Sequence, residues 1–164
     1  MPSFEPIDQS RAVTHERSDV KHYENPKYGV HFVVPATWNL DLSDKGTLVK
    51  ATRLEGACEV ELMGQSSLPL RSLGYEVEAL SREILDKNEN FRRVGERPVA
   101  LGNIKEGHEI QFVAAVEEQE VLQRYLVARK NMAVYILVTT MASTFQPGCE
   151  KDAEGIRENV RIEK

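Results

Sequence analysis

Hydrophobic and polar residues alternate along much of the chain, which is the pattern of β-strands that are buried on one side. In residues 58–62, for example, Cys58, Val60 and Leu62 alternate with two glutamates. The most apolar segment, residues 132–139, is expected at the centre of a sheet. This pattern, together with turn residues such as Glu55–Gly56, predicts strands at 20–23, 30–34, 47–53, 57–63, 91–101, 108–116, 120–128 and 132–139, and a short last strand from Ile162.

The hydrophobic period changes from two to about 3.6 in two places, and each change predicts a helix. Over residues 73–87, four apolar residues are spaced by four, three and four, and Ser72 before them is a suitable N-cap. A second helix is predicted from a cap at Ser143 or Thr144 to about Val160. The inward faces of the two helices are expected to consist of Leu73, Val77, Leu80 and Ile84, and of Ala153, Ile156 and Val160.

The order of these elements is strands, helix, four strands, helix. It contains no βαβ repetition, so it disfavours a parallel sheet. We predict an α+β fold in which a mainly antiparallel sheet is flanked by two principal helices, as an α/β/α sandwich. Pro98 within residues 91–101 indicates an edge strand or a bulge. Residues 1–19 lack periodicity and are predicted to be a flexible N-terminal arm that precedes one domain of residues 20–164.

Length and charge narrow the classes of function. The 164 residues carry a net charge of −5 with acidic and basic residues interspersed, so no basic stripe for nucleic acid is present. No apolar run approaches the about 20 residues of a membrane-spanning helix. Residues 1–19 contain no apolar signal segment, which predicts a cytoplasmic protein. The alternative of an exported protein or lipoprotein whose signal segment was removed stays open.

The two cysteines, Cys58 and Cys149, do not form a disulfide framework of the kind found in small secreted domains. On the expectation of a reducing compartment, we predict two unpaired thiols.

Motifs of catalysis are missing from the sequence. The pair Ser66-Ser67 lacks the Gly-x-Ser-x-Gly context, and neither a Walker loop nor a His-Glu-x-x-His motif is present. We therefore predict no catalytic residues, no cofactor site and no enzymatic activity. A metal site is the one chemical hypothesis that the histidines permit. If Glu24–Gly29 closes a hairpin, His22 and His31 would face each other and could bind a divalent metal together with a carboxylate.

Three segments carry a resemblance to a known family. They are residues 28–38 (YGVHFVVPATW), residues 94–112 with LGNIKEGHE at 101–109, and residues 124–162 with RYLVAR, AVYILVTT and IRENVRI. In their order and pattern they resemble the PsbP/DcrB-like α/β/α sandwich family, a fold shared with a Ran-binding nuclear-import factor. The resemblance covers residues 20–164. It implies a non-enzymatic protein of the kind that assists assembly of photosynthetic complexes, acts as an envelope lipoprotein or binds partner proteins, and it transfers no site residue.

Two functions follow as hypotheses. The first is a protein-interaction or complex-assembly module that contacts a protein partner through a sheet face or through the edge strand marked by Pro98. The second is a small-molecule or metal-binding domain, or a minor hydrolase, with a pocket between the sheet and the helix of residues 73–87. Such a pocket would be lined by Tyr23, Trp38, Tyr75 or His31.

Overall fold

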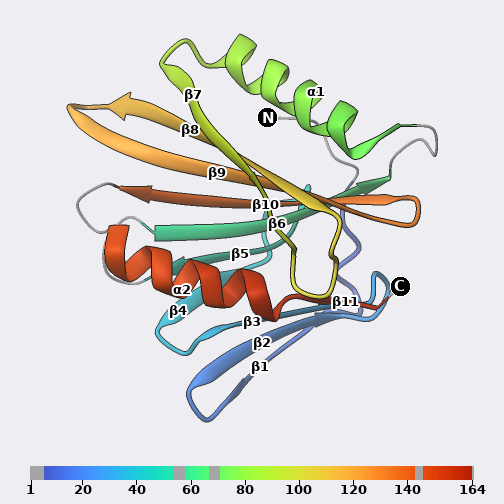
Figure 1. Cartoon of the computed structure of the whole chain (residues 1–164). Coiled ribbons are helices and arrows are strands. Elements are labelled where there is room, and N and C mark those ends of the chain that lie inside the picture. Colours follow the sequence, from blue (N-terminus) through green and yellow to red (C-terminus); the bar gives the residue numbers. More distant parts are fainter. Residues whose placement is uncertain (1–5, 54–57, 67–70, 143–145, 164) are drawn as a thin grey trace.

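The computed structural model describes residues 6–53, 58–66, 71–142 and 146–163 (Figure 1). Within these residues the chain forms a seven-stranded sheet, a four-stranded sheet and two long helices, and every strand pairing is antiparallel. The predicted α+β fold, a mainly antiparallel sheet flanked by two principal helices, is confirmed.

The large sheet has the strand order β4-β5-β6-β10-β9-β8-β7. Strand β10 is the fourth of the seven and is buried at most positions, which confirms the central place predicted for residues 132–139. Strand β7 lies at one edge, as Pro98 indicated, and its register shifts between Arg93 and Gly95. The seven strands are β4 (Trp38–Asp41), β5 (Thr47–Arg53), β6 (Cys58–Ser66), β7 (Phe91–Pro98), β8 (Gly107–Val116), β9 (Gln119–Lys130) and β10 (Ala133–Ala142).

The small sheet has the order β1-β2-β3-β11 and comprises β1 (Val13–Arg17), β2 (Val20–Asn25), β3 (Val30–Pro35) and β11 (Arg161–Ile162). The alternation of β2 and β3 sends Tyr23, Phe32 and Val34 inward, and each is at most 1% exposed. These side chains join the core that the small sheet and α2 share with one face of the large sheet.

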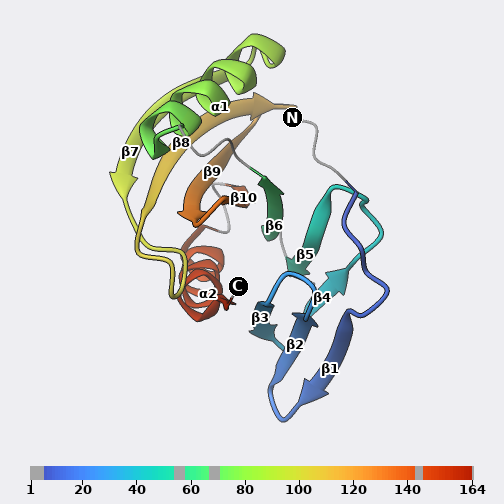
Figure 2. The same ribbon diagram turned by 90° about the vertical axis from the view of Figure 1, so that its right-hand side faces the viewer.

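The two helices cover opposite faces of the large sheet. Helix α1 (Leu73–Lys87) lies over β7, β8 and β9, whereas α2 (Gln146–Asn159) lies on the other face beside β3 and β10 (Figure 2). Ser72 caps α1, because its Oγ accepts a hydrogen bond from the Tyr75 N–H at 3.1 Å. The buried side chains of Val77, Leu80 and Ile84 hold α1 on the sheet, and their burial contributes about 5–9 kcal/mol.

The predicted N-terminal arm is wrong for residues 13–17, which form β1 and pair with β2 from Val13↔Glu24 to Arg17↔Val20. Residues before β1 also contact the domain, since the Ile7 N–H donates to the Lys45 carbonyl at 2.7 Å. Every residue of β1 is exposed, so this strand has no hydrophobic alternation from which it could be predicted. The division into an arm and a domain of residues 20–164 stays a prediction. The turn at Glu55–Gly56 and the cap at Ser143 or Thr144 lie outside the described residues.

Candidate functional site

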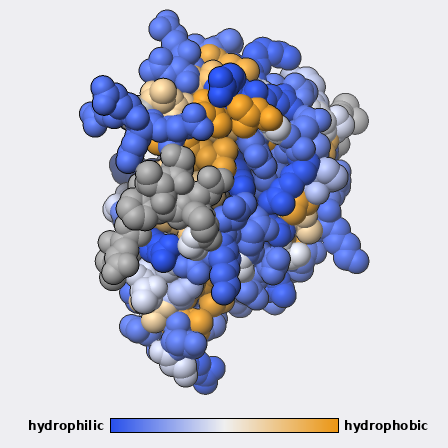
Figure 3. All heavy atoms as spheres, turned by 60° about the vertical axis from the view of Figure 1, so that its left-hand side comes forward, coloured by the Kyte–Doolittle hydropathy of each residue, from blue (hydrophilic) through white to orange (hydrophobic). Residues whose placement is uncertain are grey.

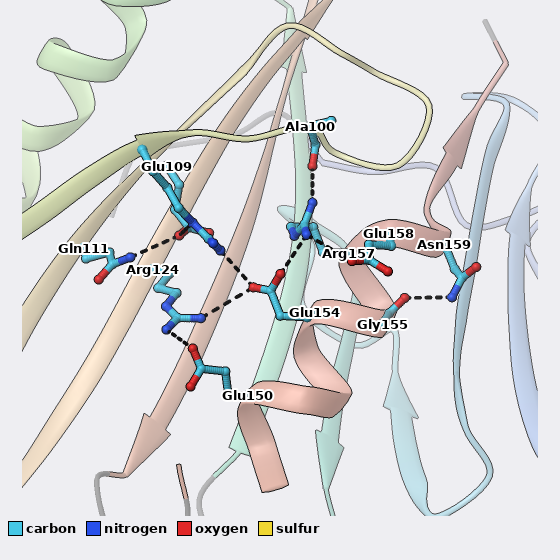
Figure 4. A network of polar contacts seen from close by, with 11 residues as sticks. Ala100, Glu109, Gln111, Arg124, Glu150, Glu154, Gly155, Arg157, Glu158 and Asn159 are labelled. Atoms are coloured by element: carbon cyan, nitrogen blue, oxygen red, sulfur yellow. Dashed lines mark hydrogen bonds and ion pairs between the residues drawn. The ribbon is translucent and has the colours of Figure 1, made fainter. Parts of the chain in front are cut away.

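A network of charged side chains lies between α2 and the strands β7, β8 and β9 (Figure 4). Its centre is the Glu154 carboxylate, which accepts hydrogen bonds from Arg97 at 2.8 Å and from Arg157 at 2.7 Å. Arg124 forms an ion pair with the same carboxylate at 3.6 Å and donates to Glu150 at 2.6 Å. The network therefore joins one helix to three strands by side-chain contacts alone.

Strand register and helix period bring these groups together. Arg97 and Glu109 face each other across β7 and β8, with Arg97 Nε donating to Glu109 at 2.8 Å. Glu150, Glu154 and Arg157 are spaced by four and three residues, so they share one side of α2. Glu109 is 3% exposed and Arg124 is 8% exposed, so each of these charges depends on its own partners in the network for compensation.

The electrostatics of the network favour ionised carboxylates. Burial raises the pKa of Glu154, but the hydrogen bonds from Arg157 and Arg97 outweigh burial and hold that pKa below its usual value. Burial lowers the pKa of Arg97, while its bonds to Glu109 and Glu154 raise it by more. A carboxylate held in its charged form by arginines is a poor proton donor or acceptor at neutral pH. The network is consequently an anchor for α2 and does not have the properties of an acid–base site.

Two guanidinium nitrogens of the network, Nε of Arg124 and Nε of Arg157, are buried without a hydrogen-bond partner in the described part of the chain. The other nitrogens of these arginines are engaged, and Arg157 also donates to the Ala100 carbonyl at 2.7 Å. The three arginines of the network, Arg97, Arg124 and Arg157, are balanced by the carboxylates of Glu109, Glu150 and Glu154. This balance leaves no excess positive charge for a small anion.

The histidines predicted to bind a metal do not face each other. In the β2–β3 ladder, His22 lies opposite Val33 and His31 lies opposite Glu24. The ring of His22 stacks instead on that of His15 in β1, with 4.7 Å between ring centroids, and His31 lies 3.6 Å from the Glu24 carboxylate.

The turn between β2 and β3 explains this register. Strand β2 continues to Asn25, whose side chain accepts from the Lys27 N–H and donates to the Tyr23 hydroxyl. The ladder therefore closes with the pair Asn25↔Val30, two positions away from the predicted register. No group of three or more residues suited to hold a metal occurs among the described residues. A metal site at His22 and His31 stays a prediction.

The cysteines correct a second prediction. Cys58 in β6 and Cys149 in α2 form a disulfide, with 5.7 Å between their Cα atoms and 91 residues between them in sequence. Both cysteines are almost fully buried in the core on the α2 face of the sheet. The bond ties α2 to the large sheet at the opposite end of the helix from Arg157.

The predicted pocket between the sheet and α1 is occupied by side chains. Val77, Leu80 and Ile84 of the helix pack with Ile110, Phe112 and Tyr125 of the sheet in one buried cluster. Tyr23 and Trp38, which were expected to line the pocket, are fully buried in the core on the other face, and Tyr75 is 54% exposed on α1. These three residues and His31 on β3 therefore do not share a cleft.

The face of the large sheet that carries α1 is only half covered. The helix packs on β7, β8 and β9, and the described residues place no helix over β4, β5 and β6 on that side. The uncovered half, here called the open face, presents the side chains of Asn39, Asp41, Lys50, Thr52, Glu59 and Glu61, and Thr47 on the same side is buried at 3% exposure. Figure 3 shows another side of the molecule, whose surface is mostly hydrophilic and whose largest group of hydrophobic atoms lies in its upper part.

Charged groups on the open face are paired with one another. Lys50 and Glu59 form an ion pair at 2.9 Å, and the Thr47 hydroxyl donates to Glu61 at 3.0 Å. Burial raises the pKa of Glu61 above its usual value, although the Thr47 hydroxyl and Lys50 act in the opposite direction. Burial, with the nearby Glu61, raises the pKa of Tyr125 to about 12. The open face is thus polar, and its side chains are ordered by these contacts.

The architecture defines the class: the fold is that of the PsbP/DcrB-like α/β/α sandwiches, as the sequence resemblance predicted. The chain is similar to the cyanobacterial PsbP protein (CyanoP) of Synechocystis sp. PCC 6803, with a TM-score of 0.69 and 10% identity over 90% of this chain and 95% of that protein. It is also similar to LpqN of Mycobacterium tuberculosis, a protein involved in cell envelope biogenesis, with a TM-score of 0.61 and 14% identity over 82% of this chain and 83% of that one. The Ran-binding protein Mog1p of Saccharomyces cerevisiae follows at a TM-score of 0.58 and 8% identity, covering 87% of this chain and 95% of Mog1p. No family model and no curated protein sequence matches the chain.

The sequence did not reveal the charged network or the disulfide, because both depend on which faces the topology brings together. A partial signal for the network existed. Glu109 and Arg124 stand at positions between apolar residues of strands that were predicted correctly, which is unusual for charges in buried strands. Opposite charges at such positions in two neighbouring strands could have been interpreted as a buried ion network.

Proposed function

We propose that this protein is a non-enzymatic interaction or complex-assembly module that binds a protein partner of unknown identity. The observation that carries the proposal is the open face, a structured sheet surface of β4, β5 and β6 without a helix over it in the described part of the chain. The fold is shared with a protein described as Ran-binding and with one described as involved in envelope biogenesis, which supports the same class of function.

The charged network and the filled α1 interface also support an interaction module. The network fixes α2 with ionised side chains, and the α1 interface is packed with apolar ones. Neither arrangement provides a hollow with convergent polar groups, which is what a small-molecule or hydrolytic site requires. The pocket alternative therefore receives no support from the packing.

The disulfide supports a second part of the proposal, which concerns location. Disulfides persist in oxidising compartments and are uncommon in the cytosol. We propose that the protein acts in an oxidising compartment, in accordance with the exported alternative and against the cytoplasmic prediction. None of the helices in residues 6–53, 58–66, 71–142 and 146–163 is long and apolar enough to cross a membrane.

Site-specific photo-crosslinking in the native host tests the interaction function. A photoreactive residue replaces Thr52, which is exposed on the open face, or Leu85, which is 38% exposed on α1 as the matched control. We expect one recurrent protein adduct from position 52 that is missing from position 85. Purification of that protein and direct binding at micromolar concentration would then establish the pair. If position 52 yields no protein adduct under conditions in which a known complex in the same cells is crosslinked, the proposed function is wrong.

A further inference from the structure

The residues before β1, here called the strap (residues 6–12), lie across the small sheet and the start of β5 (Figure 2). Every residue of the strap is half-buried or exposed, and its apolar contacts with the core come from Ile7 and Ala12, which are only partly buried. Yet the strap covers Tyr23 and Asn25, which are 0% exposed. A segment with so little buried apolar surface of its own opens at a lower free energy than the strands that it covers.

The side chain of Gln9 makes the central contacts of the strap. Its Nε2 donates to the Leu48 carbonyl at 2.7 Å, and its Oε1 accepts from the Tyr23 hydroxyl at 2.9 Å. Leu48 is the residue that the register shift between β5 and β6 leaves out of the ladder, so its carbonyl is open to a side-chain donor. The Gln9 carboxamide is therefore bound at its nitrogen and at its oxygen by two different parts of the domain.

Backbone groups fix the polarity of this contact at both ends. The Lys27 N–H donates to Oδ1 of Asn25, so the Asn25 amide presents Nδ2 to the strap. This nitrogen donates to the Tyr23 hydroxyl at 3.1 Å, and the hydroxyl in turn donates to Gln9. At the other end, the Leu48 carbonyl can only accept. The pocket thus requires an oxygen acceptor on the Tyr23 side and an N–H donor on the Leu48 side, which is the chemistry of a primary carboxamide.

The backbone of the strap is bound as well. The Ile7 N–H donates to the Lys45 carbonyl at 2.7 Å, and the Asp8 N–H donates to the Tyr28 hydroxyl at 3.0 Å. Asn25 also donates to the Asp8 carbonyl at 3.0 Å. These contacts use backbone groups that any extended segment carries. The carboxamide is consequently the part of the strap whose identity the groove distinguishes.

We propose that the groove under the strap is a binding site for an extended segment of a partner protein that carries a glutamine, and that the strap is its internal, exchangeable occupant. The strap shows which ligand fits, namely a segment that inserts a carboxamide between Tyr23 and Leu48 while Asn25 binds the preceding carbonyl. Opening of the strap presents these groups as a small preformed set of polar contacts, which is what gives a binding site its specificity. The groove is built from the small sheet and the backbone of β5, so the inference goes beyond the open face and does not depend on the partner proposed there.

The full chain with Gln9→Ala tests the site, because this change empties the pocket and leaves the groove residues unaltered. A peptide that copies the strap, acetyl-Pro-Ile-Asp-Gln-Ser-Arg-Ala-amide, is titrated into the ¹⁵N-labelled variant and followed by NMR. We expect binding, with shift changes at the Asn25 side-chain amide and at the Leu48 backbone amide. The peptide with glutamate in place of glutamine should bind at least about tenfold more weakly, because a carboxylate has no N–H for the Leu48 carbonyl. The wild type should bind the glutamine peptide at least about tenfold more weakly than the variant does, because its own strap must first be displaced.

Two further variants complete the test. Ser10→Ala changes an exposed strap residue and is the matched control, which should bind the peptide as the wild type does. Ile7→Ser loosens the strap outside the pocket, so it gives a second route to a free groove if Gln9→Ala does not fold. It should bind the glutamine peptide more tightly than the wild type and keep the preference over the glutamate peptide.

Three results would overturn the inference. The first is equal binding of the glutamine and glutamate peptides. The second is the lack of any shift change in Gln9→Ala and Ile7→Ser at millimolar peptide. The third is a wild-type dimer in light scattering that the peptide dissociates, because this result would assign the groove to the strap of a second copy of the chain in place of a partner protein.

Discussion

Breaking the Cys58–Cys149 disulfide is predicted to remove much of the stability of this protein. The bond closes a loop of 91 residues, and the loop-closure relation gives an entropy loss of about 15 cal/mol/K in the unfolded chain. At 25 °C this corresponds to about 4.6 kcal/mol. A domain of this size has a free energy of unfolding of about 5–15 kcal/mol, so reduction leaves a marginal protein. Both cysteines are buried, and reduction alone removes no atoms from the core, so the effect should arise chiefly in the unfolded state.

The assay is urea unfolding of the full chain, oxidised and reduced, followed by far-UV circular dichroism. We expect a lower midpoint after reduction and a larger dependence on urea, because the reduced chain unfolds to a more expanded state. Cys149→Ala is the matched control, since it should be as unstable as the reduced protein or more so and should not respond to reductant. Free energies of unfolding that agree within about 1 kcal/mol before and after complete reduction would refute the entropic reasoning. Alkylation of two free thiols in the unreduced, denatured protein would refute the bond itself.

Three further predictions concern single residues. Gly102→Ala should lower the free energy of unfolding by at least about 2 kcal/mol in urea titrations, because a Cβ there would lie 1.7 Å from the Val160 carbonyl oxygen at a φ of +54°. Glu154→Gln should lower the free energy of unfolding by about 1–2 kcal/mol at pH 7, and by progressively less as the pH falls below about 4.5. The reason is that the Glu154 carboxylate, whose pKa is lowered by its arginine partners, stabilises the fold only while it is charged. Glu61→Gln should show the opposite trend. Because the pKa of Glu61 is raised, the free energy of unfolding of the wild type falls as the pH rises above about 4.5, and that of the variant should fall less in the same urea titrations. Parallel pH profiles of variant and wild type would contradict either glutamate prediction.

The alternating strands and the two helices could be predicted from the sequence because their core residues carry the pattern. Residues 58–62 send one side of their strand into an apolar cluster, so their period of two is visible without knowledge of the partners. Residues 133–142 are buried on both sides of the sheet and appear as a continuous apolar segment, which is typical of a central strand. Strand β1 has no buried residue, and β4 has only four residues with Trp38 as its one buried position, so neither has a measurable period. Both missed strands are edge strands, which bury fewer residues than central ones.

The remaining errors concern contacts between segments that are distant in sequence. The pairing of Cys58 with Cys149 was judged from cellular compartment, yet it is decided by the position of α2 over β6. The opposition of His22 and His31 depended on where the hairpin closes, and the buried side chain of Asn25 shifts that closure by two residues. Glu109 and Arg124 appeared in the sequence as isolated charges in apolar strands. Their partners follow only from the β7–β8 register, which sets Arg97 opposite Glu109, and from the position of α2, which brings Glu150 and Glu154 to Arg124.

Three side-chain ties fix α2 on its face of the large sheet. The disulfide holds the first half of α2, the Trp38 indole N–H donates to Asp152 in the middle of the helix at 3.2 Å, and the network around Glu154 holds the second half. A helix fixed at three levels by a covalent bond, a hydrogen bond and ion pairs is unsuited to move aside for a partner, because each tie would have to be broken at a cost of one to several kcal/mol. The open face requires no such rearrangement, since it exposes formed strands. Contacts with the proposed partner are therefore expected on the open face, and α2, fixed on the opposite face, acts as the frame that supports its strands.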